Sequence, residues 1–284
     1  MKALLFEINF PFFSVKVPYA YQMRVSNILV PPSTLFSAIY RSYVEVCGWD
    51  YSLETLQLFT ENIQYVGVAV LPREKNREEI GIKVSSLLLR HFRTAEQQKR
   101  AEGKEGDAML REIVFLDGRL IGLVLYDELK NMTEAVEAIT WLGNTESLVS
   151  TRVLEELPVE SRETSIEGEA VMTQIVADDR SKLPQFGVVE IAGKIAPPRG
   201  EGRKPQDVCY VWHPVASLEP DVFRPIRVRD IRSYVESHGA VLVKSTVLEC
   251  SFAAIVDEFN VIFSSSSHSR GRKKGKRGKH GGVN

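Results

Sequence analysis

The sequence has few of the residues that build disulfide frameworks, metal centres or membrane spans. Its three cysteines, Cys47, Cys209 and Cys250, are isolated and show no CxxC spacing. This pattern indicates neither a disulfide framework nor a zinc site, and it suits a reducing compartment. Glu7 and Asn9 interrupt the first apolar residues, and no segment approaches the roughly 20 apolar residues that span a bilayer. We therefore expect a soluble, cytoplasmic protein with no membrane contact, metal or cofactor.

Common catalytic motifs are also absent. The chain contains no Walker A sequence, no G-x-G-x-x-G, no H-E-x-x-H and no G-x-S-x-G. Metal-independent RNA cleavage needs a base, an acid and a cation, which His91 with Arg90, Arg93 or Lys83 could supply. A lone histidine on a charged segment is more often a surface or RNA-contact residue. We favour a protein that is not an enzyme, and a metal-independent endoribonuclease is the alternative.

The charge is distributed unevenly. The chain has 36 Lys and Arg against 37 Asp and Glu, but residues 264–284 hold seven of the basic residues and no acidic one. The remaining body is therefore acidic, with a net charge near −8. The tail has too few apolar residues to fold alone, and we predict a disordered basic end. It is either a non-specific phosphate-binding arm or a solubilising end.

Alternation and helical periodicity predict the elements of the first half. Strands are expected at 4–10, 63–71, 113–116 and 119–126, and the last two should form a hairpin around Asp117 and Gly118. Helices are expected at 33–46 and from 131 to Gly143, the second with a capping box of Asn131 and Glu134. Another strand is predicted at 147–153. Residues 73–111 carry ten Lys or Arg and seven Asp or Glu, which indicates an inserted arm.

This order predicts an α+β fold of the split βαβ, ferredoxin-like kind at residues 1–155. The glutamate-rich stretch 154–169 is the expected linker. Strands predicted at 186–192 and 240–248, with a loop at 197–205, indicate a smaller β-rich domain at 156–263. The ferredoxin-like plan is shared with RNA-recognition modules, but a fold does not by itself establish a function.

A polar loop and a helix start form the first candidate binding site. Pro31 and Pro32 suit the entry of a helix, and Ser33 or Thr34 could then cap its first N–H groups. The preceding polar loop would lie at the positive end of the helix dipole, which favours phosphate. The alternative is a well-capped core helix after an ordinary loop.

The inserted arm is the second candidate. Lys83, Arg90, His91 and Arg93 offer phosphate partners, and Phe92 offers an aromatic face for a base, as expected where single-stranded RNA is held. A solvated loop of mixed charge is the alternative.

Three segments together resemble one protein family. They are Phe10-Pro-Phe-Phe-Ser14, Gln22-Met-Arg-Val-Ser-Asn-Ile-Leu-Val-Pro-Pro-Ser-Thr-Leu35 and Trp141-Leu-Gly-Asn-Thr-Glu-Ser-Leu-Val-Ser150. They are similar to the CRISPR-associated Cas-five family of the RAMP superfamily, most closely to its archaeal type I-A branch. The likeness covers the N-terminal half. The glycine-rich loop of the superfamily is reduced here to Gly143, and the Tyr, Lys and His set of the RNA-cleaving type I-C branch has no match in its local context.

The resemblance implies a non-enzymatic subunit of the antiviral Cascade complex. Such a subunit holds the 5′ handle of the CRISPR RNA, caps the filament of Cas-seven backbone subunits, contacts the large subunit and meets target DNA indirectly. The arm at 73–111 would act as a thumb against RNA. The expected RNA-binding residues are Arg24, Ser26, Asn27, Ser33, Thr34, Arg41, Lys83, Arg90, His91, Arg93, Asn144 and Ser147. A third reading is a protein-interaction module whose tail alone binds nucleic acid.

Overall fold

The structure is a computed structural model that describes residues 1–18, 25–90, 108–143, 147–159, 162–163, 166–195 and 207–263. Its helices are α1 (Pro32–Cys47), α2 (Leu53–Asn62), α4 (Met132–Glu137) and α5 (Arg232–His238), with 3-10 turns η1 (Arg180–Lys182), η2 (Val228–Ile231) and η3 (Phe259–Ile262). Strands of the first half are β1 (Lys2–Asn9), β2 (Ile63–Leu71), β3 (Ile80–Arg90), β4 (Ala108–Asp117), β5 (Arg119–Tyr126) and β6 (Ser150–Pro158). Those of the second half are β7 (Arg162–Glu163), β8 (Val171–Met172), β9 (Ile175–Ala177), β10 (Val188–Gly193), β11 (Val208–His213), β12 (Val215–Glu219), β13 (Val222–Pro225), β14 (Ala240–Ser245) and β15 (Cys250–Ala254). They form four mostly antiparallel sheets, so the fold mixes α and β structure.

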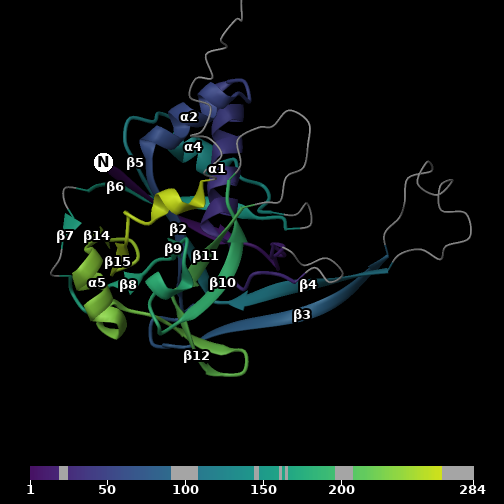
Figure 1. Cartoon of the computed structure of the whole chain (residues 1–284), viewed down its shortest axis with the longest axis vertical. Helices are drawn as coiled ribbons and strands as arrows, with labels where there is room; N and C mark the ends of the chain where they lie inside the picture. Colours follow the sequence, from purple (N-terminus) through teal and green to yellow (C-terminus); the bar gives the residue numbers. More distant parts are fainter. Residues whose placement is uncertain are drawn as a thin grey trace, which may run out of the picture.

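The central sheet has the order β2-β5-β1-β6, and every neighbouring pair in it is antiparallel. The predicted strands at 4–10 and 63–71 are confirmed as β1 and β2. Both faces of β1 are covered, because Leu4 and Leu5, which point to opposite faces, are both fully buried. Figure 1 shows α1, α2 and α4 gathered at the top of the view and the green and yellow elements of the second half below them.

Helix α1 confirms the predicted helix but not its predicted cap. Pro31 is the N-cap and Pro32 the first helical residue, and no side chain caps the helix. Ser33 and Thr34 therefore lie in the first turn, and the prediction that one of them caps it is wrong. The main-chain N–H of Thr34 donates instead to the Pro31 carbonyl at 3.0 Å. The predicted apolar stripe packs into the core, through Leu35, Phe36, Ile39 and Tyr43.

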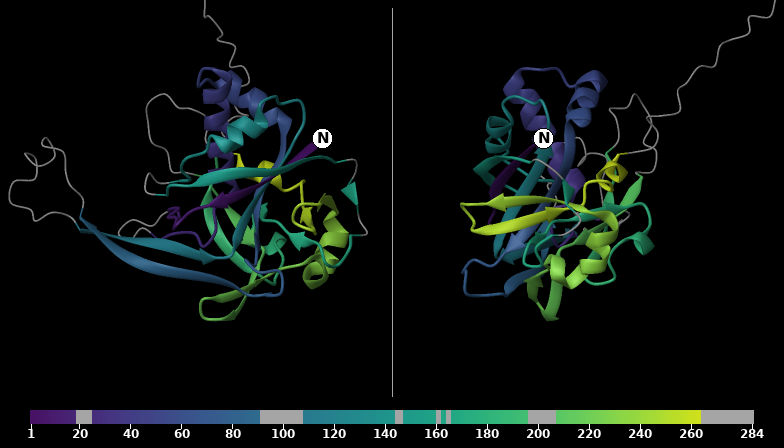
Figure 2. Two further views of the ribbon diagram at one scale, coloured as in Figure 1. Left: turned by 180° about the vertical axis from the view of Figure 1, so that it is seen from behind. Right: turned by 90° about the vertical axis from the view of Figure 1, so that its left-hand side faces the viewer.

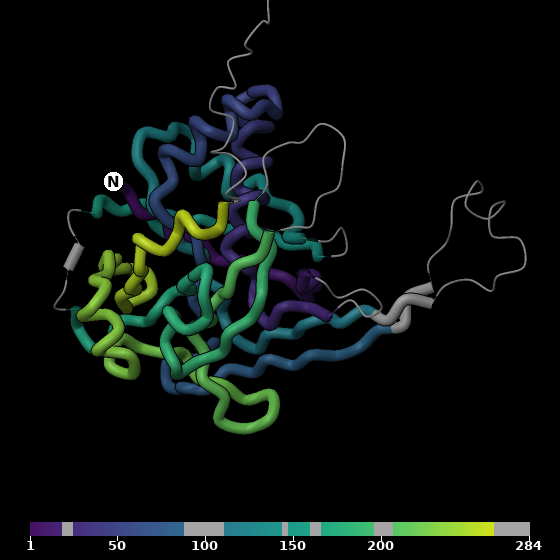
Figure 3. Tube along the Cα trace, viewed as in Figure 1, coloured from purple at the N-terminus to yellow at the C-terminus, as the bar shows by residue number. Residues whose placement is uncertain are grey.

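The inserted arm is a long two-stranded ribbon. Strand β3 pairs with β4 from Gly81↔Asp117 to Arg90↔Ala108, and the ribbon projects beyond the body in Figures 2 and 3. The predicted hairpin of β4 and β5 is wrong, because β4 pairs with β3 while β5 pairs with β1 and β2. Gly118 joins them without a positive φ, so the chain continues from one strand into the next. A Cβ at Gly118 would lie 3.1 Å from the Leu71 carbonyl oxygen, which explains the glycine.

Two helices differ from expectation. Helix α4 ends at Glu137, well before Gly143, and Asn131 makes no side-chain cap because its backbone is left-handed at φ 59°. The predicted capping box is therefore wrong. Helix α2 was not predicted. Its N-cap, Ser52, accepts a hydrogen bond from the Thr55 N–H, but only Phe59 on this helix is buried, so its apolar periodicity is weak.

The second half packs directly onto the first. One buried cluster contains Leu4 and Phe36 from the first half together with Val211, Phe252 and Phe259 from the second. The predicted linker is wrong at its start, because β6 extends to Pro158. The predicted strands near 186–192 and 240–248 are confirmed as β10 and β14. The loop expected at 197–205 and the basic tail at 264–284 lie outside the described residues. No helix in the described part has the length and apolarity to cross a membrane.

Candidate RNA-binding groove

Three segments that are distant in sequence meet beside the start of α1. The Ser14 N–H donates to Ser147 Oγ at 2.9 Å, and the Ser147 hydroxyl donates back to the Ser14 carbonyl at 3.2 Å. Gly143 lies over the first turn of α1, where a Cβ would be 3.7 Å from Thr34 Cγ2. Its φ of +79° suits glycine. The segments near residues 10–14, 25–35 and 141–150 therefore form one local structure.

A groove of about 430 Å³ opens beside this junction. Its walls are the exposed face of α1, the segment from Ala138 to Gly143, the segment from Val15 to Pro18, and residues 192–195 at the end of β10. Lys16, Arg41 and Lys194 line it, and Glu45 is its one acidic lining residue among those the structure describes. Ser33, Thr34 and Ser37 add hydroxyl groups along α1. The groove is polar and mainly basic, although the body of the chain is acidic.

The start of α1 adds a favourable field to the groove. No side chain caps this end, and its first turn carries no acidic residue. The partial positive charge at a helix N-terminus favours an anion. Pro31 and Pro32 have no N–H and the Thr34 N–H donates to the Pro31 carbonyl, so the Ser33 N–H is the first of this helix that could donate to a ligand. The Ser33 side chain is largely buried, whereas Ser37, one turn later, is exposed. The Ser37 hydroxyl donates to the Ser33 carbonyl at 2.8 Å, so it would have to release this hydrogen bond to donate to a ligand.

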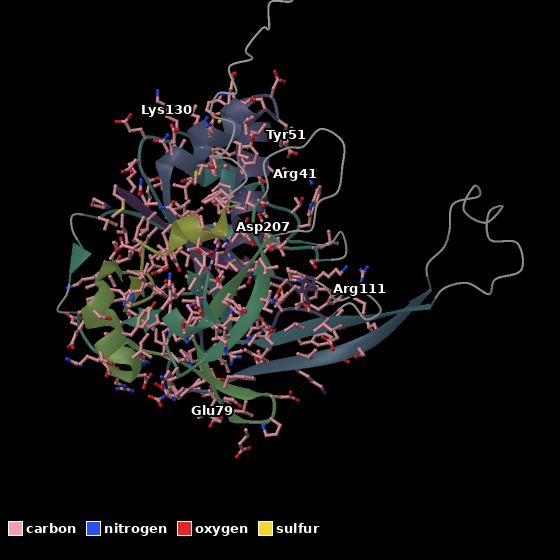
Figure 4. All side chains as sticks on the ribbon, in the orientation of Figure 1. Arg41, Tyr51, Glu79, Arg111, Lys130 and Asp207 are labelled. Carbon is pink, nitrogen blue, oxygen red and sulfur yellow. The ribbon has the colours of Figure 1, made fainter. Side chains whose placement is uncertain are left out.

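Arg41 is held in a fixed position at one end of the groove. Its guanidinium lies 4.1 Å from the centroid of the Trp141 ring, and its Nε donates to Glu45 Oε1 at 3.0 Å. The Tyr51 hydroxyl donates to the same carboxylate oxygen at 3.0 Å. Hydrogen bonds from Arg41 and then Tyr51 hold the pKa of the Glu45 carboxyl below its ordinary value, so it stays anionic near neutral pH. Figure 4 shows Arg41 and Tyr51 on the same side of the molecule.

Two lysines supply the other positive charges. Lys16 is exposed and follows Val15 in the wall of the groove. The ammonium of Lys194 donates to Asp178 Oδ1 at 2.5 Å, so part of its charge is already neutralised. The Lys194 N–H also donates to the carbonyl of Asp207, which Figure 4 labels below Arg41. Lys16 is therefore the more available of the two for a phosphate.

The side chains of Ser26 and Asn27, which are two of the predicted RNA contacts, are buried in hydrogen bonds to the protein. The Ser26 hydroxyl accepts from the Val15 N–H at 2.9 Å and donates to the Asn27 carbonyl. The Asn27 amide donates to Glu190 Oε2 and to the Ile191 carbonyl, both at 3.2 Å. Asn27 nevertheless lines the groove, and the expected RNA contacts of both residues stay predictions. Both residues fix the loop that leads into α1.

Glu190 lies at the centre of the hydrogen-bond network that holds this loop. Its Oε2 also accepts from the Ile28 N–H at 2.9 Å and lies 2.9 Å from His213 Nε2. Gln174 holds the other side of the fully buried imidazole, because its Nε2 lies 2.9 Å from His213 Nδ1. Gln174 also bonds the main chain of Val68 and Val30. The network ties the loop before α1 to strands of both halves.

The other predicted residues are distributed unevenly. Asn27, Ser33, Thr34 and Arg41 line the groove, whereas Ser147 is fully buried and supports it through Ser14. Lys83 is exposed on β3, outside the groove. Arg90 ends β3, and its side chain lies outside the described part. Arg24, His91, Arg93 and Asn144 also lie outside the described residues.

Sequence reasoning missed three lining residues, which are Lys16, Trp141 and Lys194. Trp141 begins one of the segments that carry the family resemblance, but the sequence does not show that its side chain is exposed in the groove. Lys194 follows a correctly predicted strand, but nothing local places that strand beside α1. Lys16 is a single charge next to an apolar stretch, a pattern that is common on protein surfaces.

The groove offers chemistry for binding a polyanion. Ammonium and guanidinium groups, hydroxyl groups and a helix N-terminus are the usual partners of phosphate, and an exposed indole is a partner for a base. Within the described ranges, no group of three or more His, Cys, Asp or Glu is arranged to hold a metal ion. His213 is buried in the network around Glu190, and His238 stacks on Tyr234 in α5 with ring centroids 4.1 Å apart.

Comparisons with known proteins give distant structural likenesses. No protein-family model and no curated protein sequence matches the chain. A CRISPR protein from Archaeoglobus fulgidus aligns at 15% identity over 79% of this chain and 92% of that one, with a TM-score of 0.38. A chain of the Type III-B Cmr-beta complex bound to cognate target RNA and AMPPnP aligns at 10% identity, over 84% of this chain and 89% of that one, with a TM-score of 0.40. A chain of a CRISPR RNA-guided surveillance complex aligns at 13% identity, over 83% of this chain and 98% of that one, with a TM-score of 0.40. Because these TM-scores are low, we base the functional assignment on the groove itself.

Proposed function

We propose that this chain is a non-catalytic CRISPR RNA-binding subunit of a type I, I-A-like Cascade surveillance complex. In this role it holds the 5′ handle of the CRISPR RNA and caps the filament of backbone subunits. One observation carries the proposal. The three segments that resemble the Cas-five family converge around a single basic groove, through the Ser14–Ser147 hydrogen bonds and the approach of Gly143 to Thr34.

The connectivity of the first half supports this assignment. Two βαβ units, β1-α1-β2 and β5-α4-β6, interlock in the order β2-β5-β1-β6. We interpret this arrangement as the ferredoxin-like plan of RAMP proteins. The ribbon of β3 and β4 is inserted between β2 and β5, the place expected for a thumb. Fold alone does not establish function, so this agreement is secondary to the groove.

The charge distribution favours a local RNA contact. A body with a net charge near −8 would repel RNA over most of its surface. Lys16, Arg41 and Lys194 line the same groove as the uncapped start of α1, and this concentrates attraction at one place. The Trp141 segment and residues near Ile195 enclose the groove on other sides. A short single-stranded handle would fit these dimensions better than a duplex.

The ribbon would provide the contact with other subunits. Val84, Leu87 and Phe115 on β3 and β4 are each about two-fifths exposed, which is unusual for large apolar side chains on a projecting element. The pairing places Leu87 and Phe115 on one face of the ribbon and Val84 on the other, so in the proposed complex Leu87 and Phe115 would face the adjacent Cas-seven backbone subunit. The large subunit is the second protein partner, and target DNA is reached through the guide RNA.

A charge-removal experiment tests the RNA site. We expect the full-length chain to bind a labelled single-stranded CRISPR repeat RNA, measured by fluorescence anisotropy in EDTA. Lys16→Gln should weaken binding by about 1–2 kcal/mol and reduce the salt slope by about one, because one phosphate contact is lost. Lys130→Gln is the matched control, because Lys130 is also exposed and lies away from Arg41 in Figure 4.

Each outcome separates the proposed roles. Equal affinities of both variants and the wild type would contradict the groove assignment. A denaturing gel of the same samples should show intact RNA. A discrete cut that leaves a 2′,3′-cyclic phosphate in EDTA would favour the endoribonuclease alternative. Affinity that disappears entirely on removal of residues 264–284 would favour an interaction module with a basic tail.

A further inference from the structure

Trp141 is an accessible indole in the wall of the groove. It lines the groove and has 36% of its surface exposed. Trp212 is fully buried, and its ring N–H donates to the Phe186 carbonyl at 2.8 Å. Trp49 is 37% exposed but packs edge-on against Tyr43, outside the groove. Large aromatic side chains that remain accessible in a cleft commonly act as binding contacts.

The backbone around Trp141 is held firmly on both sides. Trp141 forms an antiparallel bridge with Leu148, and the Leu142 N–H donates to the Ser147 carbonyl at 3.0 Å. The Val149 N–H donates to the Thr140 carbonyl at 2.9 Å. Ser147 is itself fixed by its two hydrogen bonds to Ser14. The indole is thus presented by a short, braced segment, and ordering it costs little when a ligand binds.

Arg41 adds a cation to the same surface. Its guanidinium lies 4.1 Å from the centroid of the indole ring, and Glu45 and Tyr51 hold this position from behind. An arginine bound in this way lies over one face of the indole and adds a positive charge and a flat guanidinium surface to it. Indole and guanidinium planes are the two side-chain surfaces on which unpaired RNA bases most readily stack.

We propose that Trp141 and Arg41 form a stacking platform for one unpaired nucleobase of the bound RNA. This inference rests on the proposed function. It specifies that a base of the RNA, and not a phosphate, binds at this end of the groove. Lys16 and the start of α1 would hold phosphates, while the platform would hold a base. Stacking reads no hydrogen-bond pattern, so the platform accepts any of the four bases and fixes the register of the strand.

The first test uses the unmodified protein. The full-length chain is titrated by fluorescence anisotropy with a labelled repeat RNA and with a series of RNAs that each lack one base. We expect one abasic position to weaken binding by about tenfold, the effect of losing one stacked base. A flat series, in which every abasic RNA binds like the parent, would overturn the platform while leaving the proposed function intact. Failure of the wild type to bind any of the RNAs would overturn both.

The second test couples the abasic position to the side chain. Trp141→Ala should weaken binding of the parent RNA by about tenfold, and the sensitive abasic position should then cause no further loss. Trp141→Phe should retain most of the affinity because it keeps an aromatic face. Trp49→Ala removes an equally exposed indole elsewhere and should bind as the wild type does. Additive losses from Trp141→Ala and the abasic site would overturn the direct contact.

Salt dependence distinguishes stacking from charge. Trp141→Ala should leave the slope of log Kd against log salt concentration unchanged, because no counterion is released on stacking. Lys16→Gln should lower that slope, since it removes a phosphate contact. A slope reduced by Trp141→Ala would show that the variant disturbs the basic groove, and would overturn a separate base site.

Discussion

The hydrogen bonds of Glu190 give a sharp prediction about the loop that enters α1. Glu190 Oε2 accepts from the Asn27 amide and the Ile28 N–H at 3.2 and 2.9 Å, and it lies 2.9 Å from His213 Nε2. Gln174 accepts from the Val68 N–H through Oε1, so its Nε2 faces His213 Nδ1 as a donor. Glu190 and Gln174 thus contact the two ring nitrogens of the buried imidazole.

Glu190→Ala should remove the shared acceptor, leave the Ile28 N–H without its acceptor and leave the Asn27 amide with only the Ile191 carbonyl. Each unsatisfied buried donor costs about 1–3 kcal/mol, and the effects within one network do not simply add, so we expect a loss of about 3–5 kcal/mol in the free energy of unfolding. Glu190→Gln keeps an oxygen acceptor and should cost only about 1–2 kcal/mol. Urea unfolding followed by far-UV circular dichroism measures both differences.

Glu219→Ala is the control for this experiment. Glu219 lies on β12 in the same half of the chain but is exposed, so its removal should change the unfolding free energy by no more than about 0.5 kcal/mol. An unfolding midpoint for Glu190→Ala that equals that of Glu219→Ala would refute the network. So would equal destabilisation by the alanine and glutamine variants, because that result would make the charge, and not the acceptor, decisive.

Three further predictions concern stability and reactivity. Ser147→Ala should cost about 1–3 kcal/mol, measured in urea, because the buried N–H of Ser14 loses its acceptor. Burial acts to raise the pKa of Asp230, but hydrogen bonds from Arg224 and the charge beside it lower the pKa overall. The ion pair therefore contributes its full stability above pH 3.8, and this contribution is lost as the pH falls through the folded-state pKa of Asp230. Asp230→Asn should reduce the loss of thermal stability at acid pH, measured in thermal melts. Burial raises the pKa of the Cys209 thiol to about 11, so it should resist a thiol reagent at pH 8 until urea unfolds the chain.

Each of these predictions has a contrary result. Wild-type stability of Ser147→Ala would show that its hydrogen bonds to Ser14 do not hold the junction. An unchanged loss of thermal stability at acid pH in Asp230→Asn would assign the pH dependence to other carboxyl groups. Labelling of three thiols within minutes in the folded chain would contradict the burial of Cys209.

Elements whose burial follows a simple period could be predicted from the sequence. The apolar stripe of α1 and the β-branched run of β2 indicate burial by their local pattern alone. The predicted ends of this helix and this strand therefore lie close to the observed ones. The link between β4 and β5 could not be predicted this way. Asp117 and Gly118 have the composition of a tight turn, but Gly118 is needed for close approach to the Leu71 carbonyl and the strand runs on.

In the candidate site, too, the local sequence pattern does not show which distant residues each side chain contacts. A polar loop before a helix is compatible with ligand contact or with burial against distant partners. For Asn27 the partner is Glu190, 163 residues further along the chain, and no local pattern reports that pairing. Arg41 was placed in the binding set, but its indole partner lies 100 residues away, so the platform became visible only in three dimensions.

The residue-by-residue pairing of β3 with β4 makes the length of the ribbon adjustable. Gly118 alone separates β4 of the ribbon from β5 of the central sheet, so the ribbon leads directly into that sheet at its base. Adding two residues to each strand would lengthen the ribbon by about 7 Å and keep every side chain on its face. Adding one residue to each would exchange the two faces. The length of the ribbon can therefore change in steps of two residues per strand without a change in the groove.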